Sequence, residues 1–376
     1  MTDAGHERLV DIDAGEAGSR SAALLVRLWT EGPAGAAGAA GSGTPRARLL
    51  TLDGGESRRW ATAVGEAAIA REVLGWVRSA VRADPLRAPA PAPRPREVPA
   101  LVGADWVQEH LGDPAVVVVE AVDGPGSPGR AGLPGSVRLS PADLRHPLRR
   151  ALPTAGALAD LMDSRGVATG SHVVVVGATS AARAAAALWT LAVCGHRRTS
   201  LLDGDVRDWA AAGRPLAPPA DRAPTTGYVP GPRRADLLLT RDQLLAGFVG
   251  APSGTALLDC RSPSEFAGEP VGDPGPAGRA RGHVPGAVGL PVEDLLEPGT
   301  QRLLQAPALE DAVRRCGVER ADHVVVYCGE NDRSPLVWFA LHELLGWPDV
   351  RCYPGAWAEY GGLTDVPVER GPALGA

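Results

Sequence analysis

Short apolar runs alternate with amphipathic segments over the C-terminal two thirds of the chain. Each run is four to seven residues long and rich in Val and Leu, which is typical of buried strands. Strands are expected at 116–121, 171–177, 255–261, 322–328 and 349–354, and helices at 308–318 and 334–346. Apolar strands joined by helices favour an α/β fold whose parallel sheets are covered on both faces. In such sheets, ligands bind at the carboxyl ends of the strands.

The first 83 residues have a different pattern. Residues 22–29 and 46–54 are predicted strands, and the second of them ends in an Asp-Gly turn signal. From 56 to 82, apolar residues recur at steps of three and four, which predicts a long helix. We therefore expect a small β-β-α module at residues 1–83, and its sequence indicates no chemistry.

The rest of the chain contains an internal duplication. AGLPGSVRL (131–139) aligns with GHVPGAVGL (282–290), and the same offset aligns SHVVVVG (171–177) with DHVVVYC (322–328). Two Pro-rich stretches, at 84–99 and 213–234, are predicted linkers. The domains expected between and after them span 100–212 and 235–370.

Composition and charge exclude several classes of protein. The 38 basic and 44 acidic residues leave a net charge of −6, and no basic tract supports nucleic-acid binding. The five cysteines are scattered and form neither a disulfide framework nor a zinc motif, so no metal or other cofactor is expected. The acidic N-terminus lacks the apolar core of a signal peptide, and no apolar run has membrane-spanning length. A cytoplasmic protein without a membrane partner is expected.

The candidate chemistry centres on Cys328, which ends a predicted strand. The loop from Gly329 to Arg333 follows, and a predicted helix begins near Ser334. Loop N–H groups and the positive end of the helix dipole would form an anion cradle that favours a nucleophilic thiolate. Arg333 adds a cation, and Ser334 before a proline fits a helix N-cap. The alternative is an inert buried cysteine.

These motifs resemble a known family. The second copy, with LLDCRSPSEFAG (257–268), VVVYCGENDRS (324–334) and PGAWAEYGGL (354–363), resembles the catalytic domain of rhodanese-type sulfurtransferases. The first copy has Gly177 in place of the cysteine and resembles the non-catalytic domain of the tandem thiosulfate and 3-mercaptopyruvate enzymes. The resemblance implies two rhodanese-like domains in tandem after the N-terminal module. It also implies that Cys328 takes a sulfur atom from a small donor and passes it, as a persulfide, to a thiol or cyanide.

The resemblance also implies roles for individual residues. Cys328 and Arg333 would be catalytic, and the loop around them would bind the persulfide through Gly329, Glu330, Asn331, Asp332 and Ser334. Four further residues would support the site. Asp259 and Arg261 are expected to form a structural ion pair. His283 is expected to be a hydrogen-bonded loop residue, and Trp357 either lines the pocket mouth or packs.

The loop departs from the family pattern in its charges. Glu330 and Asp332 match neither the thiosulfate nor the mercaptopyruvate loops. Facing the site, they would disfavour a dianionic donor, and facing solvent they would not. Asn331 stands where a glycine is usual, and a positive φ is expected there.

Loop length separates the remaining alternatives. The spacing Cys-x4-Arg is one residue shorter than the Cys-x5-Arg loop of related phosphatases. Sulfur transfer is therefore favoured over a phosphatase or an arsenate reductase. A catalytically weak rhodanese-like protein with a sulfur-carrier, regulatory or binding role is the other alternative. The sequence leaves the donor, the acceptor and the oligomeric state open.

Overall fold

The structure is a computed structural model of the 376-residue chain, which divides into two compact units, Met1–Arg87 and Ala88–Ala376. It describes residues 7–8, 23–31, 44–52, 58–64, 97–124, 131–144, 151–220, 222–252, 254–270, 279–318, 321–364 and 366–371.

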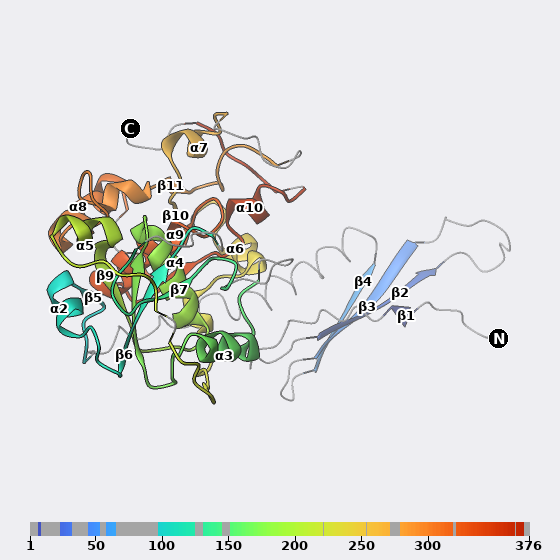
Figure 1. The fold of residues 1–376 in the computed structure, drawn as a ribbon. Coiled ribbons are helices and arrows are strands. Elements are labelled where there is room, and N and C mark those ends of the chain that lie inside the picture. Colours follow the sequence, from blue (N-terminus) through green and yellow to red (C-terminus); the bar gives the residue numbers. More distant parts are fainter. Residues whose placement is uncertain are drawn as a thin grey trace. The chain divides into compact units, whose positions relative to one another are not determined.

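The first unit contains an antiparallel sheet in the order β1-β2-β3-β4 (Figure 1). Its strands are β1 (Glu7–Arg8), β2 (Ala23–Glu31), β3 (Thr44–Leu52) and β4 (Arg58–Val64). β2 and β3 overlap the two strands predicted at 22–29 and 46–54.

The helix predicted over 56–82 is wrong at its start, because Arg58–Val64 forms β4. Trp60, Thr62 and Val64 alternate with smaller or charged residues, a period that also fits a strand. Pairing along β3 decides between the two patterns, since seven residues of β4 are in register with Arg46–Leu52. Residues 65–82 of the predicted helix lie outside the described residues.

The second unit contains two parallel sheets, in the orders β5-β9-β8-β6-β7 and β11-β10-β12-β13. The strands of the first are β5 (Leu101–Val102), β6 (Val116–Ala121), β7 (Val137–Leu139), β8 (His172–Gly177) and β9 (Thr199–Asp205). Those of the second are β10 (Thr255–Asp259), β11 (Val288–Gly289), β12 (His323–Tyr327) and β13 (Val350–Cys352). The predicted parallel α/β fold is confirmed.

The two sheets share one topology, which bears out the duplication. The order β9-β8-β6-β7 in the first matches β13-β12-β10-β11 in the second. Even β5 has a counterpart, since Leu238 forms a parallel bridge to Cys352 as Leu101 pairs with Leu201.

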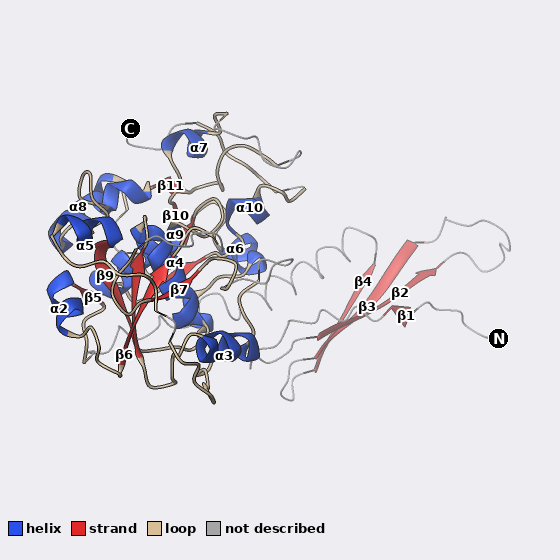
Figure 2. Cartoon of the chain, viewed as in Figure 1, coloured by secondary structure: helices blue, strands red, loops and turns tan. Residues whose placement is uncertain are grey.

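Helices surround the strands of this unit (Figure 2). In the first half they are α2 (Ala104–Glu109), α3 (Ala155–Ser164), α4 (Ala181–Val193) and α5 (Val206–Ala211). In the second half they are α6 (Arg241–Gly247), α7 (Pro263–Ala267), α8 (Ala306–Arg315), α9 (Ser334–Trp338) and α10 (Ala356–Tyr360). Short 3-10 turns occupy Ala235–Leu237 (η1) and Val292–Leu295 (η2), and a π-helical segment, η3 (Phe339–Leu344), continues α9.

The two halves of the second unit share one core. Helices α4 and α9 follow equivalent strands, β8 and β12, and pack against each other (Figure 1). One continuous apolar cluster includes Trp189 of α4, Trp338 of α9 and residues of both sheets. The indole N–H of Trp189 donates to the carbonyl of Leu237, 3.4 Å away in the other half. The first half is therefore fixed against the half that carries Cys328.

The second Pro-rich stretch packs on the first half. Ala217 forms an antiparallel bridge to Gly132, and buried Tyr228 places its hydroxyl 2.7 Å from Nδ1 of His196. Residues 84–96 of the first Pro-rich stretch lie outside the described residues. Among the described helices, none has the length and apolar character needed to cross a bilayer.

Candidate active site

Cys328 directly follows β12 at the carboxyl edge of the second sheet, and its side chain is fully buried. The thiol donates a hydrogen bond to Asp332 Oδ1 at 3.3 Å. The Sγ atom accepts from the N–H of Arg333 at 3.4 Å and from the hydroxyl of Ser334 at 3.6 Å. The predicted cradle is therefore present, but a carboxylate oxygen is also part of it.

Neighbouring backbone holds the loop in place. The carbonyl of Cys328 accepts from the N–H of Trp357 at 2.8 Å, and that of Gly329 accepts from Ala358 at 2.9 Å. Both donors belong to α10. The first turn of α10 thus fixes the position from which the loop begins.

The sequence predicts a stabilised thiolate at Cys328, but the electrostatics around its sulfur atom favour the protonated thiol. Burial raises the pKa of the Cys328 thiol above its usual value, and the Asp332 charge adds to the rise. Hydrogen bonds from Ser334 and the Arg333 N–H oppose it without reversing it. Burial and the Asp332 charge therefore favour the protonated thiol, and the Asp332 carboxylate, whose direction the sequence leaves open, faces the sulfur atom.

The expected N-cap role of Ser334 is wrong. Helix α9 begins at Ser334 itself, with Arg333 at the N-cap and Pro335 in the first turn. The fully buried Ser334 hydroxyl lies 3.6 Å from Sγ of Cys328 and 3.1 Å from Oδ1 of Asn331. Its hydroxyl is therefore part of the site around the sulfur atom.

Asn331 has the left-handed backbone that the sequence predicts, with φ of 60°. Its side chain is 3% exposed and turns back toward Ser334. Asparagine tolerates this region better than other residues with a Cβ, which explains how the loop forms without the usual glycine.

The guanidinium of Arg333 is bound by carboxylates, and its Nε lies 3.7 Å from Oδ1 of Asp332. Nη1 and Nη2 bind Glu265 of α7, with N–O distances of 2.7 and 3.0 Å. Burial raises the pKa of Glu265, but the bonds and charge of Arg333 outweigh it and lower that pKa to about 2. The same pair raises the pKa of Arg333. Its cation is thus matched by a carboxylate, and its backbone N–H contacts Cys328.

Glu265 is the residue that sequence reasoning missed. It closes a capping box with Ser262 at the start of α7, and the same carboxylate binds Arg333. The Ser-x-x-Glu pattern after the predicted strand 255–261 was the available signal. It indicates a helix start and gives no information about a partner 68 residues away.

The four supporting residues have structural contacts. Asp259 and Arg261 form the predicted ion pair, both buried, with an Nε–Oδ1 distance of 2.9 Å. Nδ1 of His283 lies 2.8 Å from the Phe266 carbonyl, as expected for a loop histidine. Trp357 is 5% exposed and its ring lies under the Arg261 guanidinium, 4.6 Å away, so it packs.

A cavity of about 260 Å³ adjoins the loop. Glu330 and Asp332 line it from the second half, and the first half supplies the other side. The lining from the first half consists of Ala121, Val122, Leu139, Ser140, Pro141, Leu144, Arg183, Ala186, Ala187 and Thr190. The two acidic side chains therefore face a cavity between the halves.

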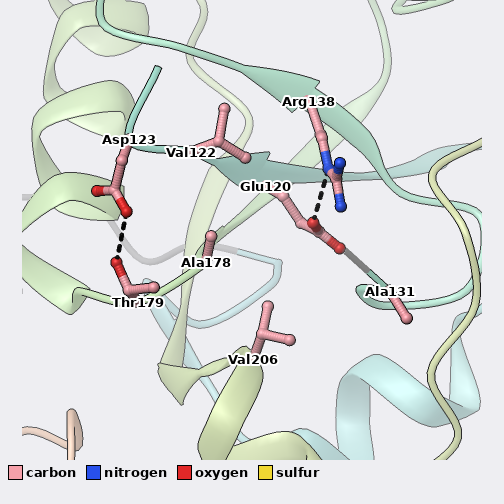
Figure 3. A pocket seen from close by; sticks show the side chains of 8 residues that line it. All are labelled: Glu120, Val122, Asp123, Ala131, Arg138, Ala178, Thr179 and Val206. Atoms are coloured by element: carbon pink, nitrogen blue, oxygen red, sulfur yellow. Dashed lines mark hydrogen bonds and ion pairs between the residues drawn. The ribbon is translucent and has the colours of Figure 1, made fainter. Parts of the chain in front are cut away.

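The first half retains a smaller counterpart of the site. A pocket of about 30 Å³ lies beside Ala178 and Thr179, which directly follow Gly177 (Figure 3). Buried Glu120 replaces Asp259, and its carboxylate accepts from Ser136 Oγ at 2.7 Å. Figure 3 shows its ion pair with Arg138, at 3.3 Å. None of the residues that line this pocket is a cysteine.

Comparison with known proteins defines the class. The family model for the rhodanese-like domain matches residues 241–362. A putative thiosulfate sulfurtransferase of Mycobacterium tuberculosis is 33% identical over 276 residues, covering 72% of this chain and 98% of the relative. The thiosulfate sulfurtransferase of Corynebacterium glutamicum is 35% identical over 72% of this chain and 90% of its own length.

A solved structure agrees with this fold. The 3-mercaptopyruvate sulfurtransferase SseA of Escherichia coli has a TM-score of 0.58 and 24% identity, covering 69% of this chain and 99% of that one. The chain belongs to the rhodanese family. It is a sulfurtransferase with two rhodanese-like sheets, of which the second carries the cysteine.

Proposed function

We propose that Cys328 is the nucleophile that carries sulfur as a persulfide. The observation that supports this most directly is the position of Sγ, at the end of β12, among Asp332, the Arg333 N–H and the Ser334 hydroxyl. Two donors can stabilise negative charge on sulfur, and one carboxylate can accept the thiol proton. Nucleophile, base and anion donors thus occupy one loop.

The loading step follows from this arrangement. The Cys328 proton moves to Asp332 Oδ1 as Sγ attacks the outer sulfur of the donor. The bond from that sulfur to the rest of the donor breaks, and its electron pair leaves with the donor remnant. From thiosulfate the remnant is sulfite, and from 3-mercaptopyruvate it is pyruvate. The relatives' names support these two donors.

In the second step a thiol or cyanide attacks the outer sulfur of the persulfide. The bond between the two sulfur atoms breaks, and its electron pair returns to Sγ of Cys328. A thiol acceptor leaves as a persulfide, and cyanide leaves as thiocyanate. Oxidation states balance, because the sulfur atom moves without an external oxidant or reductant.

Replacing the nucleophile tests this function. Cys328→Ser keeps the size of the side chain and should abolish thiocyanate formation from thiosulfate or 3-mercaptopyruvate with cyanide. The matched control is Cys316→Ser, because Cys316 is a half-buried cysteine at the C-cap of α8 whose thiol bonds the Ala312 carbonyl. Turnover retained by the Cys328 variant, with unchanged circular dichroism, would contradict the proposal.

We further propose that the protein works in the cytoplasm. All five cysteines are free in the structure, and four of them are buried. Reducing conditions keep thiols in this state.

The described residues offer no cluster of three or more His, Cys, Asp or Glu side chains for a metal ion, and neither proposed step uses one.

A further inference from the structure

Two cysteines occupy neighbouring positions at the carboxyl edge of the second sheet. Asp259, which ends β10, is in register with Tyr327, which ends β12, and a cysteine follows each of them. The N–H of Cys260 donates to the Tyr327 carbonyl at 2.8 Å, so the two chains are still paired at this level. Cys260 is therefore the neighbour of Cys328 on the adjacent strand.

The side chains of these two cysteines belong to the same face of the sheet. Residues in register on parallel strands project to the same side, and both thiols are fully buried in the apolar cluster that the two halves share. Neighbouring strands are about 4.8 Å apart, within the range of about 4.4–6.8 Å between the Cα atoms of a disulfide. A bond between the two sulfur atoms therefore needs little movement of the backbone.

The Cys260 thiol is free to react, but it is not activated. Its Sγ has a weak contact with the Leu258 carbonyl, 4.0 Å away in its own strand, and forms no disulfide. Burial raises the pKa of this thiol well above its usual value, and the nearby Cys328 adds to the rise. Since the thiolate is the attacking species, any reaction of Cys260 is slow.

We infer that Cys260 is a resolving cysteine, which attacks the Cys328 persulfide when no acceptor arrives and so releases sulfide. The inference rests on the proposed function, because it needs that persulfide. Sγ of Cys260 bonds to Sγ of Cys328, and the bond from Cys328 to the outer sulfur breaks. The outer sulfur keeps the electron pair, takes up the Cys260 proton and departs as hydrogen sulfide. The Cys260 sulfur is oxidised and the outer sulfur is reduced, so no external oxidant is used.

The position of Cys260 selects the sulfur atom that is attacked. Because Cys260 is level with Cys328 in the sheet, the register brings its thiol to the inner sulfur atom of the persulfide. The Arg333 N–H and the Ser334 hydroxyl donate to that atom at 3.4 and 3.6 Å from the loop. The same donors can stabilise the charge of the outer sulfur as it leaves.

Cys352 provides a matched control. It is fully buried in the same cluster and belongs to the same face, because it is in register with Val326, two residues before Cys328. Two residues along a strand, about 6.6 Å, and one strand spacing of about 4.8 Å place the Cα atoms of Cys352 and Cys328 about 8 Å apart. That separation is beyond the limit of about 7 Å for a disulfide.

The fate of an isolated persulfide tests the inference. Full-length protein is loaded with thiosulfate or 3-mercaptopyruvate, the persulfide on Cys328 is verified by mass spectrometry, and the donor is removed under argon. Released sulfide and intact mass are followed over hours, and disulfides are mapped on non-reduced peptides. The wild type is compared with Cys260→Ala, Cys260→Val and Cys352→Ala. The valine variant fills the space that alanine leaves, so a packing defect does not decide the result.

The wild type should release one sulfide per persulfide over minutes to hours, the timescale of uncatalysed disulfide rearrangement. Its mass should fall from about 32 Da above that of the reduced protein to about 2 Da below it, with Cys260 and Cys328 joined in one peptide pair. Both Cys260 variants should keep the persulfide at least about tenfold longer, and Cys352→Ala should behave as the wild type does.

The outcomes separate the inference from the proposed function. If the persulfide forms and transfers to cyanide, but persists without a disulfide or decays equally fast in the Cys260 variants, the inference is overturned and the proposed function stands. A disulfide to Cys352, or movement of the outer sulfur to Cys260, also overturns it. If no persulfide forms on Cys328 with either donor, both the proposed function and the inference fail.

Discussion

Asp332 places a carboxylate beside Cys328, the proposed nucleophile. Its carboxylate accepts the thiol hydrogen of Cys328 and, after burial itself, is the strongest cause of the raised pKa of that thiol. The Asp332 carboxylate has two opposing effects on the reactivity of Cys328. The carboxylate stabilises the protonated resting state, but it is also the group that can take the proton when sulfur attacks.

Asp332→Asn separates these two effects. Removing the charge should lower the pKa of Cys328, so the rate of loading from thiosulfate should reach its plateau at a lower pH than in the wild type. Above the wild-type midpoint, where Cys328 is a thiolate in both proteins and needs no base, loading should be several-fold faster in the variant, because a dianionic donor is repelled less. Stopped-flow measurement of loading between pH 6 and 10 checks this. A midpoint that stays in place, or moves to higher pH, would show that Asp332 does not control the thiol.

At this scale the sequence was a good guide to the identity of residues and a poor guide to their partners. Cys328 and the positive φ of Asn331 follow from local pattern. The pairing of Arg333 with Glu265 does not, because it depends on bringing α7 next to the loop. The direction of the Asp332 carboxylate is likewise set by packing around the loop, and the sequence left it open.

Among the elements, α7 and the loop after β12 are joined by one ion pair. Glu265 caps α7 through Ser262 and holds Arg333, whose backbone N–H contacts Sγ of Cys328. The side chains of Glu265 and Arg333 are 26% and 24% exposed, so solvent only partly screens their attraction. The pair therefore stabilises two elements that are far apart in sequence.

The pH dependence of stability follows from the lowered pKa of Glu265, about 2. A carboxylate with a lowered pKa contributes stability that is fully present above its unfolded pKa, about 4.5, and is lost as pH falls toward 2. The melting temperature of the wild type should therefore exceed that of Glu265→Gln by a constant amount from pH 8 to 5. Below pH 4.5 the difference between the two melting temperatures should become smaller.

Differential scanning calorimetry at a series of pH values measures this gap. Glu269→Gln is the control, because Glu269 is exposed and lies two residues after the end of α7. If the two melting temperatures are equal at pH 7, or if their difference grows on acidification, the assignment of Glu265 as the partner of Arg333 is contradicted.

Element by element, periodicity predicted the parallel strands well because their Val-rich runs are buried on both faces. It failed at β4, where helical and strand periods overlap and pairing with β3 decides. It also did not predict the π-helical turn η3 after α9. The predicted domain limits, 100–212 and 235–370, stay predictions.

For the second unit, Ala88–Ala376, the continuous core between its halves has a thermodynamic consequence. The cluster that contains Trp189 and Trp338 includes residues of both sheets. Neither half can lose its partner without exposing the facing surfaces of α4 and α9. We expect the two halves to unfold in one cooperative transition.

Trp189→Ala tests this coupling. Trp189 is fully buried and bonds to Leu237 of the other half, so its removal should lower the free energy of unfolding by about 3–5 kcal/mol. Urea titrations followed by circular dichroism and by tryptophan fluorescence should give one shared midpoint, moved to lower urea. Trp106→Ala, at a half-buried position in α2, should cost less. Two separated transitions in the variant, with one unmoved, would show that the halves are independent.

The central claim concerns Cys328, and intact-mass spectrometry tests it most directly. The purified protein is incubated with thiosulfate or with 3-mercaptopyruvate, and the modified site is mapped by peptide analysis. We predict a gain of one sulfur atom, about 32 Da, on Cys328 with at least one donor, and its loss when cyanide is added. A protein that gains no sulfur from either donor, or gains it on another cysteine, would contradict the proposed function.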